Sequence, residues 1–165
     1  MWLELLYAAM VVFVLCFGLV LVFGPPYLPT MHRQVEAAIK LANLKPGQTL
    51  LELGSGDGRV LVAAAQAGLN VVGYELNPLL FIFSWLRTRR YRRQVRVVFG
   101  NFWRMSWPKC DAIYVFLLPR LMTKLEQKIK AEHLNQVPLV SFAFKFKDLT
   151  PVNEEAGVFL YSLKH

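Results

Sequence analysis

Three closely spaced glycines between two acidic residues are the part of the chain whose residue types point most directly to chemistry. Glu52 precedes Gly54, Gly56 and Gly58, and Glu75 follows further along. Such glycines let the backbone turn sharply and let a ligand come close to the main chain. A helix that starts behind them offers unpaired N–H groups to an acceptor. The sequence therefore predicts a ligand site in this loop.

The spacing of the glycines distinguishes between two kinds of ligand. A dinucleotide loop has its third glycine five residues after the first, whereas here the interval is four and Arg59 occupies the fifth position. A carboxylate at Glu52 would repel a pyrophosphate but suits a cationic amino acid group. Glu75 is placed where a carboxylate can accept hydrogen bonds from both hydroxyls of a ribose. An ordinary strand–helix turn would explain the glycines alone, but the two acids together favour a nucleoside ligand without phosphates.

The elements that must position these residues alternate in type. Apolar segments typical of strands lie at 49–53, 70–75, 95–99, 112–116, 137–144 and 157–163. Helical spacing or capping residues are found at 30–45, 59–67, 78–93 and 119–134. Strands that alternate with helices form a parallel sheet with helices on both faces. We therefore expect an α/β fold, a Rossmann-like parallel sheet over residues 49–165, with Thr30 capping the first of these helices.

The N-terminal segment is the most apolar part of the chain. Residues 5–23 form a run of 19 without a charged or strongly polar side chain, which as a helix is about 29 Å long and close to a bilayer core. A cleaved signal peptide would need a basic start and a small-residue cleavage site, and a buried core helix rarely lacks a polar stripe. We expect a transmembrane anchor over residues 1–24, then a linker and N-terminal helix over 25–48.

The distribution of charge adds an orientation to this expectation. All 19 Lys and Arg residues follow the apolar segment, and the formal net charge is +8. The positive-inside rule then predicts a single-pass membrane protein with a cytoplasmic C-terminal domain. A prokaryotic plasma membrane is preferred to the mitochondrial inner membrane, because the N-terminus lacks an Arg-rich transit segment. Two separate cysteines, Cys16 and Cys110, predict neither a disulfide framework nor a metal site.

Six arginines lie within residues 87–96. Such a run can contact RNA phosphates, an anionic lipid surface or an acidic partner. On a domain held at a membrane, anionic lipid is the simpler interpretation. Nucleic acid is therefore not expected to be the partner.

From Pro26 almost to the C-terminus, the chain resembles a known family. Residues 50–59 are similar to motif I of the class I, seven-stranded, S-adenosylmethionine-dependent methyltransferases, with Glu75 at the position that follows that motif. Four further segments resemble the small lysine methyltransferases that modify the c-subunit of ATP synthase and the adenine nucleotide translocase, and their prokaryotic relatives. These segments are YLPT at 27–30, GYELNP at 73–78, FLLP at 116–119 and LEQK at 125–128. The resemblance implies S-adenosylmethionine as cofactor and a protein lysine as methyl acceptor.

The resemblance also implies a set of cofactor-binding residues. Glu52 and the loop would hold the methionine part, Glu75 the ribose, and Asn101 with Phe102 the adenine. Including the two residues that would close the pocket from the linker, the set is Tyr27, Thr30, Glu52, Gly54, Ser55, Gly56, Asp57, Gly58, Glu75, Asn77, Asn101 and Phe102.

Methyl transfer from a sulfonium is an in-line displacement, so the protein mainly aligns and desolvates the reactants. No His or Cys near the motifs is an obvious base, but an apolar aromatic pocket lowers the pKa of an ammonium and can hold it by cation–π contact. The candidates for that pocket are Tyr27, Phe102, Trp103 and Phe116, although each of them taken singly is also typical of a core residue. Enzymes that methylate the amino group of a base carry Asp/Asn-Pro-Pro-Tyr/Phe after the fourth strand, where this chain has Phe116–Pro119. Gly24–Tyr27 has a glycine in place of the required polar residue.

Together these patterns predict a membrane-anchored lysine N-methyltransferase that acts on a membrane-associated protein. Two alternatives stay open. One is a methyltransferase for a small molecule or a lipid. The other is a non-catalytic membrane adaptor that binds the cofactor, because residues 116–119 contribute no evident catalytic polar group.

Overall fold

The strands of the computed structural model are β1 (Thr49–Leu53), β2 (Asn70–Glu75), β3 (Val95–Phe99), β4 (Ala112–Val115), β5 (Leu139–Phe142), β6 (Asn153–Glu155) and β7 (Val158–Tyr161). The structure describes residues 1–23, 30–147 and 149–163, and among residues 1–23 it describes the side chains of 1–8, 10, 11, 14 and 18. The strands form one sheet in the order β3-β2-β1-β4-β5-β7-β6. β1 to β5 pair in parallel, whereas β7 is antiparallel to β5 and β6. The expected α/β fold is present, with a mixed rather than a wholly parallel sheet.

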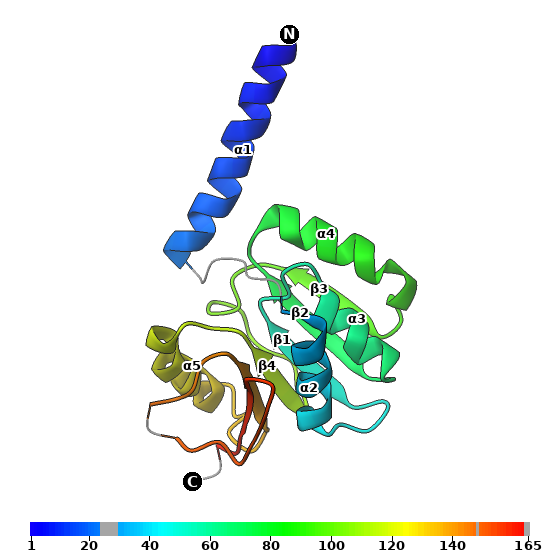
Figure 1. Cartoon of the computed structure of the whole chain (residues 1–165), viewed down its shortest axis with the longest axis vertical. Helices are drawn as coiled ribbons and strands as arrows, with labels where there is room; N and C mark the ends of the chain where they lie inside the picture. The colour runs from blue at the N-terminus through cyan, green and yellow to red at the C-terminus, as the bar shows by residue number, and fades with distance from the viewer. Residues whose placement is uncertain (24–29, 148, 164–165) are drawn as a thin grey trace.

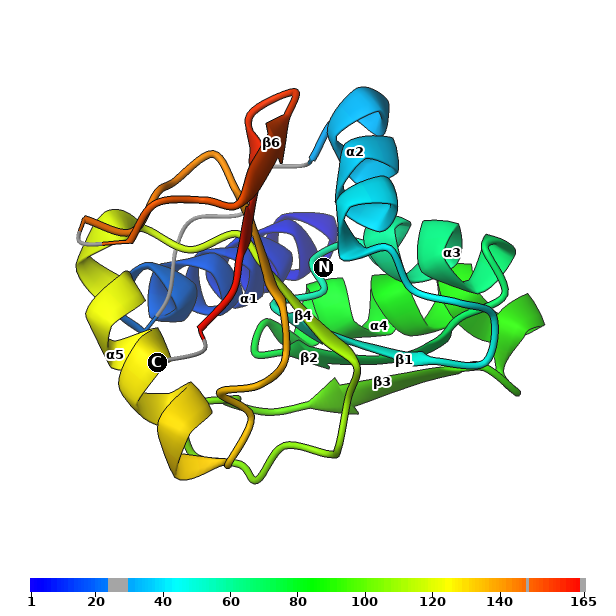
Figure 2. The same cartoon turned by 90° about the horizontal axis from the view of Figure 1, so that it is seen from below.

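The helices of the described chain are α1 (Trp2–Phe23), α2 (His32–Ala42), α3 (Arg59–Gln66), α4 (Pro78–Thr88) and α5 (Pro119–Ala131), with a 3-10 turn at Arg89–Tyr91. α2, α3 and α4 lie on one side of the sheet and α5 lies on the other (Figures 1 and 2). The parallel strands are therefore covered on both faces, as their nearly unbroken apolar sequences require.

Alternate residues of the central strand enter two separate apolar clusters. Leu50 packs with α2 and α3, in a cluster that includes Leu61. Leu51 and Leu53 point to the opposite face and pack with α5, where Leu125 is fully buried. This two-sided packing fixes the carboxyl ends of β1 and β2, from which the glycine loop and Glu75 emerge.

Three local differences from the sequence prediction have physical causes. The cap of α2 is Met31, with no side-chain hydrogen bond, because the side chain of Thr30 is directed toward the sheet. α4 ends at Thr88 rather than near Arg93, since the 3-10 turn leads the chain into β3. β6 was not expected, because its sequence Asn-Glu-Glu has no apolar residue and all of it is exposed.

The N-terminal helix corrects the expectation of a membrane anchor. Figure 1 shows α1 extending away from the sheet. Over the described residues, no helix has the length and the apolar character that crossing a membrane requires. The predicted transmembrane anchor is therefore wrong, and so is the single-pass location predicted from it, in a prokaryotic or a mitochondrial membrane.

Candidate active site

The glycine loop connects β1 to α3 and is held against the end of β2. The backbone N–H groups of Gly54 and Ser55 both donate to the carbonyl of Tyr74, at 3.0 and 2.8 Å. Gly54 has φ +105° and Gly58 has φ +77°, backbone conformations that residues with a Cβ atom rarely adopt. A Cβ placed on Gly54 would meet no atom of the described residues within 4 Å. The loop therefore leaves room for a ligand next to its main chain.

Glu75 ties the end of β2 to the loop. One carboxylate oxygen accepts the N–H of Gly56 at 2.7 Å and the other accepts the N–H of Asn77 at 2.8 Å. Burial raises the pKa of Glu75, although hydrogen bonds from backbone N–H groups act in the opposite direction. A carboxylate offers about four acceptor positions, so Glu75 still has capacity for a ligand hydroxyl.

Glu52 is a buried acidic group whose hydrogen bonding is incomplete among the described residues. Its side chain is 3% exposed, and its Oε2 atom has no hydrogen-bond partner among the described residues. Burial raises its pKa well above the ordinary value, and the nearby carboxylates of Glu75 and Asp57 raise it further. A buried polar group without a partner costs folding free energy. Such a group is typical of a site that a ligand completes, and a negative carboxylate fits a cationic ligand group.

Tyr114 on β4 lies beside Glu52 in the register of the sheet. Its hydroxyl is 3.4 Å from the hydroxyl of Thr30, and burial raises the pKa of the tyrosine, which keeps it a neutral phenol. Thr30 is buried, with its hydroxyl against that of Tyr114, and its role in closing a cofactor pocket stays a prediction. Tyr27, the other residue expected there, lies outside the described residues.

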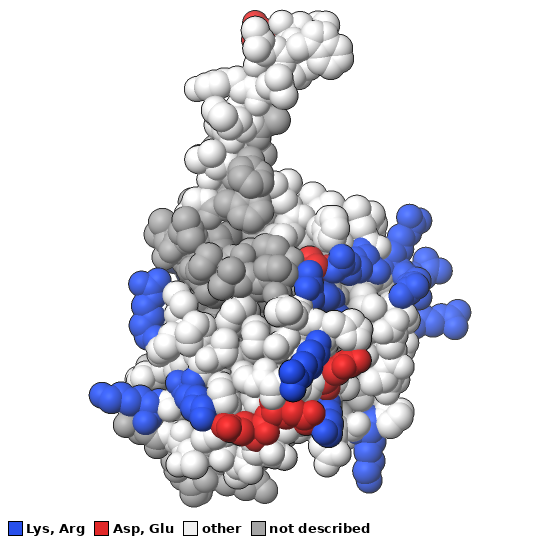
Figure 3. Space-filling model, in the orientation of Figure 1, with Lys and Arg blue, Asp and Glu red and all other residues white. Residues whose placement is uncertain are grey.

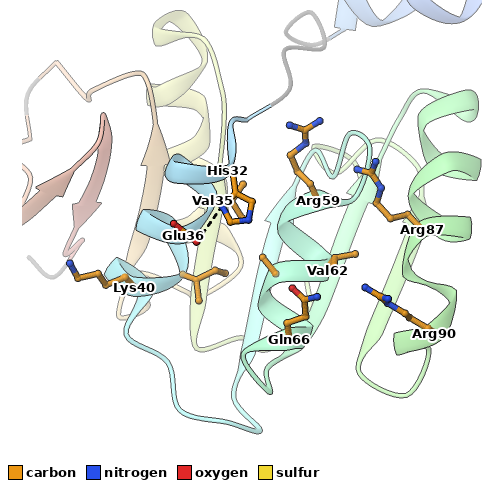
Figure 4. A pocket seen from close by; sticks show the side chains of 11 residues that line it. His32, Val35, Glu36, Lys40, Arg59, Val62, Gln66, Arg87 and Arg90 are labelled. Atoms are coloured by element: carbon orange, nitrogen blue, oxygen red, sulfur yellow. Dashed lines mark ion pairs between the residues drawn. The ribbon is translucent and has the colours of Figure 1, made fainter.

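Asp57 is held by two arginines rather than directed at a free space. Arg59 donates to both of its oxygens at distances from 2.8 to 3.2 Å, and Arg87 on α4 donates to Oδ2. Arg59 also donates to the carbonyl of Thr30 at 2.6 Å. Burial alone would raise the pKa of Asp57, but the two guanidinium groups lower it below the ordinary value. Figure 4 shows Arg59 and Arg87 extending from α3 and α4 toward the same region, so this network joins the start of α2, the glycine loop and α4.

Two asparagines of the predicted set bond to the main chain. The fully buried side chain of Asn77 caps α4 by accepting the N–H groups of Leu79 and Leu80, at 2.9 and 3.2 Å. Asn101 accepts the N–H of Trp103 at 3.0 Å. Both therefore shape the turns that follow β2 and β3, and their roles toward a cofactor stay predictions.

The aromatic candidates that the structure describes fall into two clusters. Phe102 packs on Trp103 with ring centroids 4.6 Å apart, after β3. Phe116, after β4, packs on Phe142 at 4.7 Å and on Phe144 at 6.0 Å. The sequence did not single out Phe142 and Phe144, although both lie just where an apolar fifth strand ends.

Other residues of the site were also missed. Arg59 was noted only for breaking the glycine spacing, Arg87 only as part of the arginine run, and Tyr114 not at all. A tyrosine within the apolar β4 was the available signal for a buried polar group.

The family to which these features belong follows from sequence comparison. Residues 52–153, more than half of the chain, match the family described as the ANTKMT methyltransferase domain. The chain belongs to this methyltransferase family.

Named relatives support the assignment to the ANTKMT methyltransferase family. The chain is 35% identical to the lysine N-methyltransferase of the ATP synthase C-subunit from Rattus norvegicus, an alignment that covers 76% of the chain and 59% of the relative. It is 37% identical to adenine nucleotide translocase lysine N-methyltransferase of Mus musculus, covering 77% of the chain and 56% of the relative. The chain thus spans less than two thirds of the length of these relatives.

A solved structure agrees with the fold and the cofactor. An RNA methyltransferase from Salinibacter ruber, in complex with S-adenosyl-L-homocysteine, matches with a TM-score of 0.67 and 25% identity, over 81% of this chain and 91% of that chain. S-adenosylhomocysteine is what S-adenosylmethionine becomes once its methyl group has left. The predicted cofactor, S-adenosylmethionine, is thereby confirmed.

Proposed function

We propose that the chain is an S-adenosylmethionine-dependent protein-lysine N-methyltransferase. The observation that carries the proposal is the buried Glu52 carboxylate, which has an oxygen without a partner among the described residues. It stands next to a loop whose first glycine faces open space. The α-amino group of the cofactor is a cation of the right kind to complete this site, because charge-assisted hydrogen bonds are the strong ones.

In this proposal, each of the other predicted residues binds a different part of the cofactor. Glu75 accepts hydrogen bonds from the ribose hydroxyls, and Asn101 and Phe102 lie beside the adenine. Thr30, held by Arg59 and facing Tyr114, closes the pocket over the methionine part. When bound, the cofactor supplies a methyl group on a sulfonium, which an amine can displace in line.

The acceptor pocket in this proposal is aromatic. Trp103 already holds one ammonium group in this structure, since Nζ of Lys124 lies 4.6 Å from its ring centroid. An apolar wall of this kind lowers the pKa of an entering lysine, which releases its proton to solvent before it reacts. Phe116, with Phe142 and Phe144, excludes water and aligns the amine.

The class of substrate follows from the relatives by analogy. Their names give the ATP synthase C-subunit and the adenine nucleotide translocase as the proteins acted on, and both of these are membrane proteins. We therefore propose a lysine on a membrane protein or a membrane-associated protein as the acceptor. This proposal concerns the substrate and requires no spanning helix in the chain itself.

The test is to incubate the purified chain with methyl-labelled cofactor and separate membrane and soluble fractions, and then to locate the label in protein, lipid or RNA. We expect labelled methyllysine in protein. Glu75→Gln is expected to abolish the labelling, since the amide cannot replace both oxygens as acceptors. Glu154→Gln, on the exposed β6, is the matched control and should leave it unchanged.

Two outcomes would contradict the proposal. Label in lipid or in a small molecule would favour a different methyl acceptor. An absence of label in every fraction, from a chain that still binds the cofactor, would favour the adaptor.

A further inference from the structure

Helix α4 is packed with its polar residues inward. Ser84 and Thr88 are buried, at 0% and 3% exposed. The close packing against the glycine loop explains the choice of a small residue at position 84. A Cβ placed on Gly58 would lie 2.6 Å from the hydroxyl oxygen of Ser84, so neither position has room for a larger side chain.

The outer face of α4 is apolar. Leu79, Ile82, Phe83 and Leu86 recur at intervals of three and four residues, which places them on one stripe of a helix. Their side chains are 39–52% exposed, and Trp85 next to them is 51% exposed. A surface helix normally buries such a stripe against the core. A contiguous exposed patch of this kind marks an interaction site.

The stretch of sequence that contains this stripe carries positive charge only, and its Arg87 pairs with the largely buried Asp57 of the glycine loop. Residues 76–110 contain eight Lys and Arg and no Asp or Glu. Arg89, Arg90, Arg92 and Arg93 are all exposed at the C-terminal end of α4 and in the turn after it. Figure 3 shows Lys and Arg side chains gathered beyond that end of the helix, next to an uncharged surface. Whatever covers α4 must therefore be apolar at its centre and anionic around it.

We propose that the apolar stripe of α4 and the arginines that follow it bind the surface of an anionic lipid bilayer. A helix with Leu, Ile, Phe and Trp on one face and arginines beside it is suited to the boundary between headgroups and acyl chains. Each arginine near an anionic surface adds about 1 kcal/mol of attraction. The contact is peripheral and depends on α4 rather than on a spanning segment.

Two other partners fit the face less well. A second copy of the chain would bring two regions of eight positive charges together, which like-charge repulsion opposes. RNA phosphates would engage the arginines but would leave the apolar stripe in water. A bilayer satisfies both parts of the surface at once.

The test measures binding of the full chain to phosphatidylcholine vesicles with and without phosphatidylglycerol, by co-sedimentation. α1 has exposed apolar side chains and no Lys or Arg, so binding through α1 would not depend on lipid charge. The gain on adding phosphatidylglycerol therefore reports on the arginines. Replacing Arg89 and Arg92 together by Gln is expected to lower that gain about 25-fold, at about fivefold for each charge. The same charge change at Arg33 and Arg120, both exposed on other helices, is the control and should have little effect.

The stripe is tested separately with Phe83→Ser, which should weaken vesicle binding about tenfold through lost apolar burial. Val152→Ser, at a residue that is 65% exposed elsewhere, is the control. Both variants should keep the melting temperature and cofactor affinity of the parent chain, which separates this test from that of the proposed function. The proposal is overturned if phosphatidylglycerol has no effect. It is also overturned if Phe83→Ser binds as the parent does, or if the stripe proves to be buried in a dimer or the arginines bind RNA instead.

Discussion

Two regions along the carboxyl edge of the sheet are built in opposite ways. At β1 and β2, each acidic side chain of the loop region has a defined environment, and Glu75 and Asp57 are fixed by backbone N–H groups and arginines. At β4 and β5, the side chains that follow the strands are phenylalanines, packed ring against ring. In the proposed function, the first region recognises the cofactor by directed hydrogen bonds and charge, and the second recognises the lysine by shape and apolar contact.

This difference matches what the two reactants of the proposed function demand. The cofactor is the same molecule in every turnover, so rigid polar groups can be placed for it in advance. A lysine approaching from another protein must be desolvated and aligned, which apolar walls do without an acid or a base. The comparison implies that changes at β1 and β2 alter cofactor affinity, whereas changes after β4 alter transfer.

Of the variants that test this comparison, Glu52→Gln is expected to have the largest effect on cofactor affinity. Removing the charge should weaken cofactor binding about 100-fold, because a charge-assisted hydrogen bond contributes about 1.5–3 kcal/mol. The same change should stabilise the cofactor-free chain. Burial raises the folded-state pKa of Glu52, so the cost of ionising it grows as the pH rises from the ordinary carboxyl pKa through the raised one. Calorimetric titration and urea unfolding near neutral pH measure the two effects.

Glu154→Gln again serves as the control for Glu52→Gln and should alter neither quantity. A loss of stability in Glu52→Gln without the cofactor would show that Glu52 has a structural partner. In that case the Glu52 carboxylate would not be the group that a ligand completes.

A smaller effect is expected from Asp57→Asn, which tests whether the arginine network stabilises the polar region. The pKa of Asp57 is lowered in the folded chain. Its contribution is therefore present above the ordinary carboxyl pKa and is lost as the pH falls through the lowered value. Because Arg59 and Arg87 are 35% and 37% exposed, we expect only about 1 kcal/mol of unfolding free energy. Urea unfolding as a function of pH should show a weaker loss on acidification in the variant.

A double-mutant cycle with Arg87→Gln separates the ion pair from other effects of Asp57→Asn. Additive losses in the two single variants would mean that α4 is not coupled to the glycine loop through Asp57. A coupling energy of the same sign as the attraction supports the network.

The smallest effect on cofactor affinity is expected from Phe116→Leu, which alters the apolar region. Loss of ring packing, about 0.5–1.5 kcal/mol in such clusters, should lower the rate of methyl transfer by about two- to tenfold and leave cofactor affinity unchanged. Phe83→Leu, on the outside of α4, is the matched control for the rate in solution. Parallel losses of affinity and rate in Phe116→Leu would erase the proposed division between the two regions.

Much of the polar region could be predicted because its signals are local. The bounds of β1, β2 and β3 agree with the predicted segments 49–53, 70–75 and 95–99, since buried parallel strands are short apolar runs that end at loops. The glycine loop and Glu75 stand in one strand–helix–strand unit. Their spacing along the chain therefore translates directly into proximity.

Longer-range features could not be predicted. Arg87 reaches Asp57 across 30 residues of chain, and Tyr114 meets Thr30 across 84, and only the folded sheet order brings them together. The N-terminal prediction failed for another reason: it rested on the length, apolar composition and charge distribution of a run of residues, and no helix of the described residues bears it out. The inward packing of Ser84 could not be predicted either. Helical periodicity identifies the apolar stripe of α4 but does not indicate whether the stripe faces the core or the solvent.

That outward stripe has a consequence for the behaviour of the free chain. Exposed Ile82, Phe83 and Trp85 would make copies of the protein adhere to one another at high concentration. The acid-free stretch at 76–110 gives every copy the same sign of charge in the same place. We expect mutual repulsion of these surfaces to oppose aggregation, and high salt, by screening it, should be the condition in which the solubility of the chain falls first.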